Sequence, residues 1–353
     1  MSPAAFRRLA LAVLVALALL VITGAAVRLT GSGLGCPDWP TCTRQSYVAA
    51  FSFHPMVEFV NRVIVIAVTV LIAATMLGAL ARAPRRRDLA WLALALVAGY
   101  VAQIVLGGLT VLFKLAPPLV MAHLLLSMAM VWAAVVLFRR AGQPDTAATP
   151  MVAGSVVVLG RLIVVFLAVV LTAGTAVTGS GPHSGNIGAK RLPFAFSSAA
   201  EFHATAVLFL IGITVATLVV VHQSGVPVGV QRRGRVLLEL MVVQGIVGYV
   251  QYFLHVPALL VELHVALATV VWIAALWFHL GLFHRAPEVV AASVVVGSSE
   301  GAGSPGDSSP APVGAGAMAG SWAGMTPSPG ALAGNGAGGA AARAAGGAAG
   351  AEA

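Results

Sequence analysis

The sequence predicts an all-α membrane protein of eight transmembrane helices, arranged as two tandem four-helix repeats. Of the 353 residues, 59% are hydrophobic and only 9% are charged, and the mean hydropathy is +0.97. Soluble domains carry far more charge, so this composition suits lipid as the solvent. A helix needs about 20 mostly apolar residues to cross the hydrocarbon. The chain has eight such stretches, at about 8–28, 57–81, 89–113, 119–138, 159–178, 202–222, 235–254 and 258–282.

A duplicated stretch divides the eight spans into two groups of four. Each copy begins with a glutamine, has a glycine four residues later, and reaches a histidine twenty residues after the glutamine, beyond a proline-bearing turn. The copies run from Gln103 to His123 and from Gln244 to His264. The run Thr-Gly-Ser-Gly also occurs twice, at residues 30–33 and 178–181. Because each repeat holds an even number of spans, we expect both halves to share one orientation, related by a pseudo-twofold axis along the membrane normal.

We expect three segments along the chain. The N-terminal four-helix half covers residues 1–145, and the C-terminal half covers 146–290. Residues 291–353 are rich in Ala, Gly, Pro and Ser and have few apolar side chains larger than alanine. Such a composition cannot bury enough apolar surface to fold. The sequence therefore predicts a disordered cytoplasmic tail.

The net charge of +9 comes largely from arginines that cluster between the spans. These clusters fall in alternate loops, which the positive-inside rule assigns to the cytoplasm. We therefore expect a multi-pass protein of the plasma membrane with both termini cytoplasmic, and no nucleic-acid partner. The clusters are Arg7 and Arg8; Arg82, Arg85, Arg86 and Arg87; Arg139 and Arg140; Arg232, Arg233 and Arg235; and Arg285.

The first outer loop, at about 29–56, is long and contains both cysteines of the chain, Cys36 and Cys42. An oxidising outer face favours a disulfide between them. The alternative is a pair of free or metal-binding thiols, but two ligands without a neighbouring His or Cys make a poor metal site.

Span two opens with Glu58, Asn61 and Arg62, which share one face of a helix. A carboxylate within a span is costly unless it faces the bundle interior or a cavity, so Glu58 is a candidate catalytic residue. The alternative is a Glu58–Arg62 ion pair at the membrane interface that only closes the end of the helix.

The histidines His123, His203 and His264 fall with Glu58 at similar depth near the outer face, one on each even-numbered span. His203 and His264 lie at matching positions of spans six and eight and can reach a flat macrocycle from opposite sides. Two such histidines fill both axial positions of a haem iron. The alternative is a proton relay of the kind found in transporters.

The N-terminal half differs because Asn61 occupies the position that corresponds to His203. This half therefore offers one firm iron ligand, His123, beside the carboxylate of Glu58. An iron with an open position next to an acid or base suits a reaction rather than electron storage. The spacing thus predicts a cofactor half and a substrate half.

The chain resembles the haem A synthase family, in its actinobacterial-like branch. The matching motifs cover all eight spans and leave only the tail unmatched. They are the run from Arg28 to Pro40 with Cys42, the run from Glu58 to Arg62, Gln103 with Gly107 and Gly108, and the three histidines His123, His203 and His264.

The resemblance implies haem b in the C-terminal half, with His203 and His264 as its ligands. It implies haem O as the substrate in the N-terminal half, served by His123, with Glu58 as the carboxylate essential for turnover. The implied reaction oxidises a ring methyl of haem O to a formyl group by successive hydroxylations, giving haem A for terminal oxidases. Cys36 and Cys42 would form an outer disulfide that stabilises the loop.

The departure from the family pattern is Asn61, where much of the family has histidine. Substrate haem is then held by His123 alone or coordinated from elsewhere, with His54 a distant candidate. Arg28 and Arg62 stand at the outer ends of their spans. They either pair with haem propionates or extend to the membrane interface without a ligand.

Two other functions compete with a haem-modifying oxidoreductase. A bis-histidine membrane cytochrome b in quinol electron transfer shares the His203 and His264 site but would be expected to have two complete histidine pairs. A transporter built from repeats would contain no haem and would show broken helices near the bilayer midplane. The candidate partners of an enzyme are haem O, the enzyme that forms it, and a quinol or another electron donor.

Overall fold

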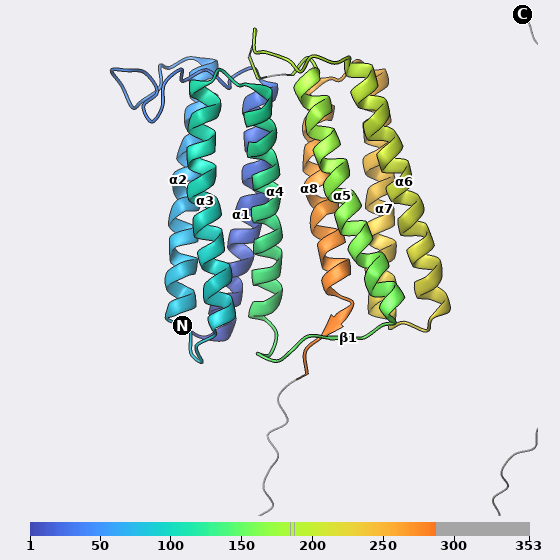
Figure 1. The fold of residues 1–353 in the computed structure, drawn as a ribbon. Coiled ribbons are helices and arrows are strands. Elements are labelled where there is room, and N and C mark those ends of the chain that lie inside the picture. The colour runs from blue at the N-terminus through green and yellow to red at the C-terminus, as the bar shows by residue number, and fades with distance from the viewer. Residues whose placement is uncertain (184, 187, 287–353) are drawn as a thin grey trace, which may run out of the picture. The chain divides into compact units, whose positions relative to one another are not determined.

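The computed structural model describes residues 1–183, 185–186 and 188–286, and the predicted tail at 291–353 lies outside them. The described part of the chain folds into a bundle of eight long helices (Figure 1). Each helix is long and apolar enough to cross a membrane, which confirms the predicted all-α membrane class. The helices are α1 (Pro3–Leu29), α2 (Phe53–Leu80), α3 (Arg87–Leu112), α4 (Pro117–Ala141), α5 (Gly154–Ser180), α6 (Phe196–Gln223), α7 (Val228–Phe253) and α8 (Ala258–Leu280).

All eight predicted spans are confirmed, and every helix except α8 begins before the apolar stretch that predicted it. The first turns contain polar or charged residues that lower the local hydropathy although they are helical. In α1, for example, the hydroxyl of Ser2 accepts a hydrogen bond from the N–H of Ala5 at 3.3 Å. Pro3 follows at the first helical position, where a missing N–H costs nothing.

The same chain reversal joins α3 to α4 and α7 to α8. In each connection two consecutive residues take positive φ angles, 51° and 60° at Lys114 and Leu115, and 61° and 54° at His255 and Val256. Side chains other than glycine rarely adopt this left-handed region. Its occurrence at equivalent positions shows that the duplication extends to the backbone of the turns.

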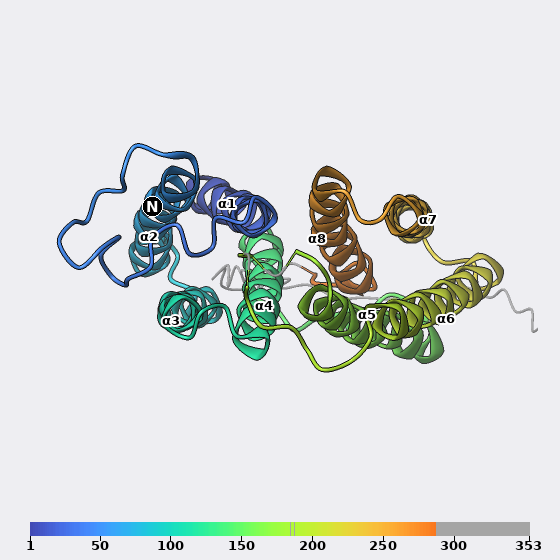
Figure 2. The same cartoon turned by 90° about the horizontal axis from the view of Figure 1, so that it is seen from above.

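The two halves meet through α1, α4, α5 and α8 (Figure 2). The contact of α1 with α8 corresponds to the contact of α5 with α4, and the equivalent helices α4 and α8 also touch each other. A twofold axis passing between α4 and α8 produces this set of contacts. At the interface, Trp272 of α8 donates its indole N–H to the carbonyl of Met128 on α4 at 2.9 Å.

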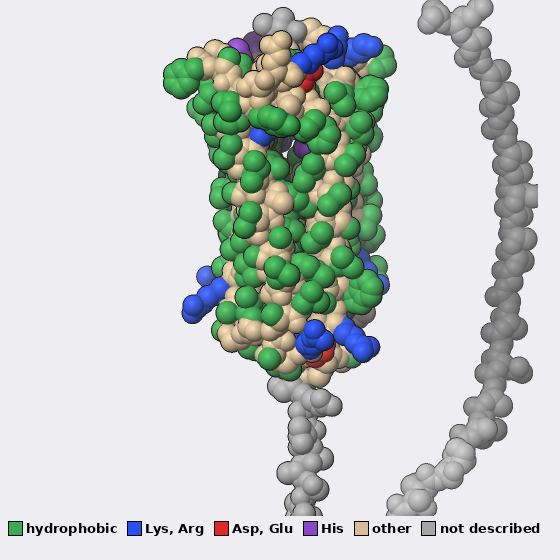
Figure 3. Space-filling model, turned by 90° about the vertical axis from the view of Figure 1, so that its left-hand side faces the viewer, with side chains coloured by type: hydrophobic (Ala, Val, Ile, Leu, Met, Phe, Trp, Pro, Cys, Tyr) green, Lys and Arg blue, Asp and Glu red, His purple; other side chains and the backbone are tan. Residues whose placement is uncertain are grey.

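The bundle has two chemically different ends. The end formed by the connections that follow α1, α3, α5 and α7 is called the loop end, and the opposite end, with the N-terminus, is called the arginine end. Apolar side chains cover the middle of the face in Figure 3, and Lys and Arg side chains lie toward the two ends. Large apolar residues are exposed along the helices, such as Ile66 and Val70 of α2, as expected for a surface that contacts lipid.

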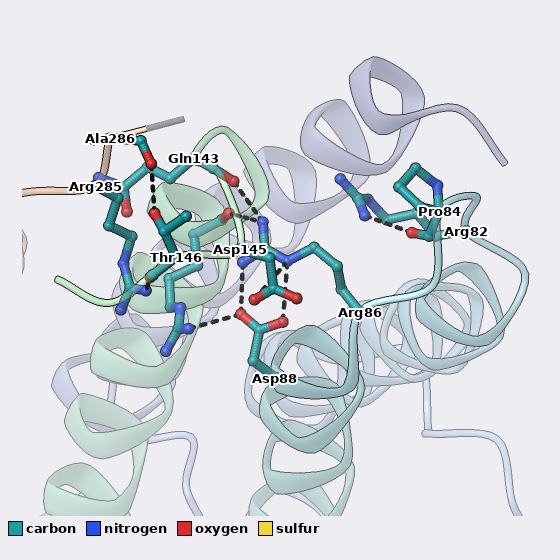
Figure 4. Close-up of polar contacts among 10 residues, drawn as sticks. Arg82, Pro84, Arg86, Asp88, Gln143, Asp145, Thr146, Arg285 and Ala286 are labelled. Carbon is teal, nitrogen blue, oxygen red and sulfur yellow. Dashed lines mark hydrogen bonds and ion pairs between the residues drawn. The ribbon is translucent and has the colours of Figure 1, made fainter. Parts of the chain in front are cut away.

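A polar network at the arginine end ties the connection between α2 and α3 to the end of α4 (Figure 4). Arg86 binds both carboxylate oxygens of Asp88, at 3.0 and 2.6 Å. It also donates to the carbonyls of Arg140 and Gln143, at 3.1 and 2.5 Å. Arg140 in turn pairs with Asp88 at 2.9 Å. Only 4% of the Arg86 side chain is exposed, so these bonds are shielded from solvent.

The linker between the halves is held at the same end by the segment that follows α8. A short antiparallel ladder pairs β1 (Thr149–Pro150) with β2 (Phe283–His284). Nearby, the hydroxyl of Thr146 donates to the carbonyl of Ala286 at 2.7 Å, and Arg285 donates to the carbonyl of Thr146. The start of the C-terminal half is therefore fastened to its last described residues.

Replacing Arg86 with alanine should lower the stability of the bundle, because the half-buried Asp88 carboxylate would lose its bidentate partner and two carbonyls would lose a buried donor. We expect a loss of about 2 kcal/mol, measured as a lower unfolding midpoint of the purified protein in detergent. The neighbouring exposed Arg87 provides the control, since Arg87→Ala removes the same charge without these bonds. Equal midpoints for the two variants would contradict the structural role of Arg86.

Candidate functional site

A cavity of about 320 Å³ lies near the loop end, mainly among the helices of the N-terminal half, with residues of α5, α8 and the connection after α5 completing its wall. It is mostly apolar, but polar and charged side chains from all four N-terminal helices reach it. In Figure 3, atoms of Arg or Lys and of His are visible between apolar side chains near this end. The polar lining includes Arg28, Glu58, Asn61, Arg62, Gln103 and His123, together with Tyr100, Thr110, Ser127, Thr175, Thr178 and Lys190. The fold thus brings together all the residues predicted for the N-terminal site.

Glu58 and Arg62 fasten the long loop after α1 to α2. Glu58 is 6% exposed. One of its carboxylate oxygens accepts the N–H of Cys36 at 2.8 Å, and the other accepts from Arg62 at 2.5 Å. The guanidinium of Arg62 also donates to the loop carbonyls of Cys36, Asp38 and Thr41, at 3.3, 3.2 and 3.0 Å. The predicted ion pair therefore exists, and it does more than close a helix end.

Cys36 and Cys42 form the predicted disulfide within this loop, and both residues are buried. The disulfide closes a short ring that begins at Cys36, whose backbone N–H donates a hydrogen bond to Glu58. Trp39, inside that ring, contributes to the wall of the cavity. A methyl group built on Gly108 of α3 would lie 2.7 Å from the indole ring of Trp39, so only glycine allows this close packing of the loop on α3.

Each of the three predicted histidines packs against a glycine of the preceding helix. A methyl group built on that glycine would lie 3.1 or 3.2 Å from the Cε1 atom of the imidazole. The pairs are Gly107 with His123, Gly174 with His203, and Gly248 with His264. All three histidines lie within about two turns of the first residue of their helices, so the predicted common depth is confirmed.

The glutamines of the duplicated stretch hold the backbone beside two of these histidines. Gln103 donates its side-chain amide to the carbonyl of His123, and Gln244 donates to the carbonyl of His264, both at 2.9 Å. Both contacts span twenty residues. The spacing repeated in the two halves thus has a structural reason. It places an amide donor on an odd-numbered helix opposite the histidine of the following helix.

His203 and His264 face each other in the C-terminal half, with ring centroids 6.4 Å apart. An iron bound to two imidazole nitrogens at about 2.0 Å each, as in other metal–histidine bonds, places the ring centroids roughly 6.3 Å apart. Nδ1 of His203 lies 3.1 Å from the carbonyl of Val170, a contact that leaves Nε2 available to a metal. The separation of the two rings is therefore that of two imidazoles that could share one iron.

On α2, Asn61 stands where the repeat would place a fourth histidine, the counterpart of His203. Its amide donates to the hydroxyl of Thr23 on α1 at 3.0 Å, and no other hydrogen bond of Asn61 occurs among the described residues. When the two Thr-Gly-Ser-Gly runs are aligned, Ala26 of α1 corresponds to Gly174, the glycine against which His203 packs. The N-terminal half thus lacks both the imidazole and the glycine of the fourth pair.

Arg28 and Arg62 differ in the donors that remain free. Arg62 is engaged by Glu58 and the loop carbonyls, whereas Arg28 lines the cavity and its guanidinium makes no hydrogen bond with any described residue. Glu262 of α8 is the charged residue that interacts with Arg28 electrostatically. An anionic group in the cavity would therefore find the whole guanidinium of Arg28 unengaged, whereas both terminal nitrogens of Arg62 already donate to the loop and to Glu58.

His54 does not line the cavity. Its Nδ1 lies 3.1 Å from the hydroxyl of Ser32, so it ties the first turn of α2 to the loop and does not join the histidine set. Sequence reasoning missed Trp39, Thr23 and Gly174 as residues of the site. Trp39 could have been found from its place inside the cysteine ring, but nothing in the sequence indicates that Thr23 meets Asn61. Among the described residues, no group of three or more His, Cys, Asp or Glu side chains is placed to hold a bare metal ion.

Comparison with known families identifies the relatives of the chain. The model of the cytochrome oxidase assembly protein family COX15-CtaA matches residues 7–51 and 45–183, about half of the chain. The protein belongs to this family, the haem A synthase family, and thereby to the multi-pass membrane proteins of cytochrome oxidase assembly. The matched part contains the disulfide loop, Glu58 and His123, whereas His203 and His264 lie beyond it. No curated protein matches the chain.

Proposed function

We propose that the protein is a haem A synthase, which oxidises a ring methyl of haem O to a formyl group by successive hydroxylations and loss of water. The observation that carries this proposal is the difference between the halves. One half pairs His203 with His264 at a distance that suits a single iron, and the other joins one histidine to a carboxylate in a cavity. Cytochrome oxidase assembly, the role of the family, requires such a haem-modifying step.

In this proposal the cavity of the N-terminal half receives the substrate, haem O. His123 faces one side of the macrocycle, and Arg28 supplies unengaged donors to a propionate. Asn61 is a poor iron ligand, so the opposite side of the macrocycle stays open. Trp39 and the disulfide loop cover the cavity and restrict the entry of water.

Glu58 is the residue proposed to accept and return the protons that oxygen atoms at the reacting carbon release or take up. It lies in the cavity wall, and its carboxylate is positioned by the Cys36 N–H and by Arg62. A carboxylate held in this way contributes as a general acid or base, an effect of about 10²- to 10⁴-fold in rate.

His203 and His264 would hold haem b, the cofactor of the C-terminal half, which would supply electron transfer rather than substrate oxidation. Val170 and Gly174 contact the imidazole of His203, and Gly248 contacts that of His264. Gln244 holds the backbone carbonyl of His264. The candidate electron donor is a quinol, with dioxygen as the oxidant that gives one oxygen atom to the carbon and the other to water in each hydroxylation. The enzyme that forms haem O is a candidate partner. The arginine-rich connections support a plasma-membrane protein with cytoplasmic termini.

The test is extraction and chromatography of the haems bound to the purified protein, expressed with and without an enzyme that makes haem O. We expect haem b alone without that enzyme, and haem A or a hydroxylated intermediate of haem O with it. Haem b alone in both cases would favour a membrane cytochrome b in quinol electron transfer. The absence of any haem would favour a transporter.

A further inference from the structure

A second hollow of about 570 Å³ lies between α1 and α2 and is more open than the cavity. We call it the lateral groove. Its only polar side chains are Thr23, Ser52 and Asn61, and large apolar side chains form the rest. The apolar lining includes Ala26 and Val27 of α1, Phe51 of the loop, and Val57, Val60 and Ile64 of α2.

Asn61 belongs to the walls of both the lateral groove and the inner cavity. Its amide bonds to Thr23 across the junction between α1 and α2. The equivalent junction between α5 and α6 is filled by the imidazole of His203 against Gly174. The N-terminal half has the shorter Asn61 at this junction, and Val27 also lines both hollows, so the cavity and the groove adjoin there.

We propose that the lateral groove binds the isoprenoid chain of the haem substrate while the macrocycle occupies the inner cavity; this inference rests on the proposed function. Haem O carries a farnesyl chain on a hydroxyl-bearing carbon attached to the ring. Such a molecule needs a polar macrocycle site, a small polar contact at the hydroxyl and an apolar channel beyond it. The cavity, Asn61 and the groove supply these three in that order.

The chemistry of the junction agrees with this order. The Oδ1 atom of Asn61 accepts no hydrogen bond from the described residues, so it is free to accept one from the hydroxyl at the base of the chain. Beyond it, the groove offers aliphatic and aromatic surface, which an apolar chain can contact closely by van der Waals packing. Phe51 is 99% exposed and lies at the loop side of the groove. The free end of the isoprenoid chain would leave the groove there.

The proposal predicts that the N-terminal site distinguishes haem O from protohaem, the molecule called haem b above, which lacks the isoprenoid chain. The purified full-length protein, already loaded with haem b, is titrated with each haem and followed by absorbance. We expect wild type to bind haem O at least tenfold more tightly than protohaem. Val60→Trp and Ala26→Trp, which fill the groove, should reduce this preference to near equality without changing the affinity for protohaem.

Val63→Trp is the matched control, because Val63 lies on the same helix and is 48% exposed but lines neither hollow. The haem b spectrum of each variant reports that the bundle has folded. An undiminished preference for haem O in both groove variants would overturn the groove assignment while leaving the synthase function intact. If wild type bound and converted no haem O at all, the proposed function would fail together with it.

Discussion

Replacement of His203 or His264 by alanine is expected to abolish the low-spin haem spectrum of the purified protein. The two imidazoles lie 6.4 Å apart between centroids, and each is seated against a glycine that leaves no room for another side chain. With one of them removed, the iron loses an axial ligand and no other described histidine faces the site. We expect haem b content to fall at least tenfold, measured by the pyridine haemochrome spectrum per mole of protein.

The control for this prediction is His222→Ala, since His222 is exposed at the arginine end and should leave the spectrum unchanged. His123→Ala adds a second comparison, because it removes a histidine at the same depth from the other half. It should preserve the low-spin signal and reduce haem O binding. An unchanged spectrum in both His203→Ala and His264→Ala would refute the axial ligation.

Replacement of Glu58 by alanine is expected to stop the formation of haem A while haem b remains bound. Glu58 lines the N-terminal cavity, far along the chain from the two histidines of the C-terminal half. Loss of the carboxylate removes a proton-exchanging group, for which a decrease of at least 100-fold in product formation is expected. The measurement is the ratio of haem A to haem O in extracts of cells that make haem O.

Because Glu58 also anchors the disulfide loop, alanine alone does not separate chemistry from positioning. Glu58→Gln keeps an oxygen that can accept the Cys36 N–H but cannot exchange a proton as a carboxylate does. Inactivity of both variants supports the chemical role, whereas full activity of Glu58→Gln would reduce Glu58 to a loop anchor. Glu201→Ala, a change of an exposed carboxylate at the same end of the bundle, should be neutral.

Much of the fold could be predicted because the membrane imposes a simple rule on the sequence. Every helix must be apolar over about 20 residues, so all eight could be counted, and the spacing between Gln103 and His123 repeats in the second half. Helix ends could not be placed as well, because residues such as Arg7 and Arg8 are helical but polar.

The site could be predicted where the place of a residue along its helix is enough to locate it. The histidines and Glu58 follow from their depth in the spans. The partner of a side chain, by contrast, depends on the rotation of two helices about their axes, which hydropathy does not determine. The commitment of Arg62 to loop carbonyls and the bond from Asn61 to Thr23 therefore emerged only from the structure.

The interface between the halves has a consequence for the origin of the chain. The contacts of α1 with α8, of α5 with α4, and of α4 with α8 are those of an isologous dimer, in which one surface patch meets its own copy. A single four-helix chain with these faces would satisfy them by pairing with itself. Fusion of two such copies frees each to change independently, which is how one half can keep His203 while the other carries Asn61.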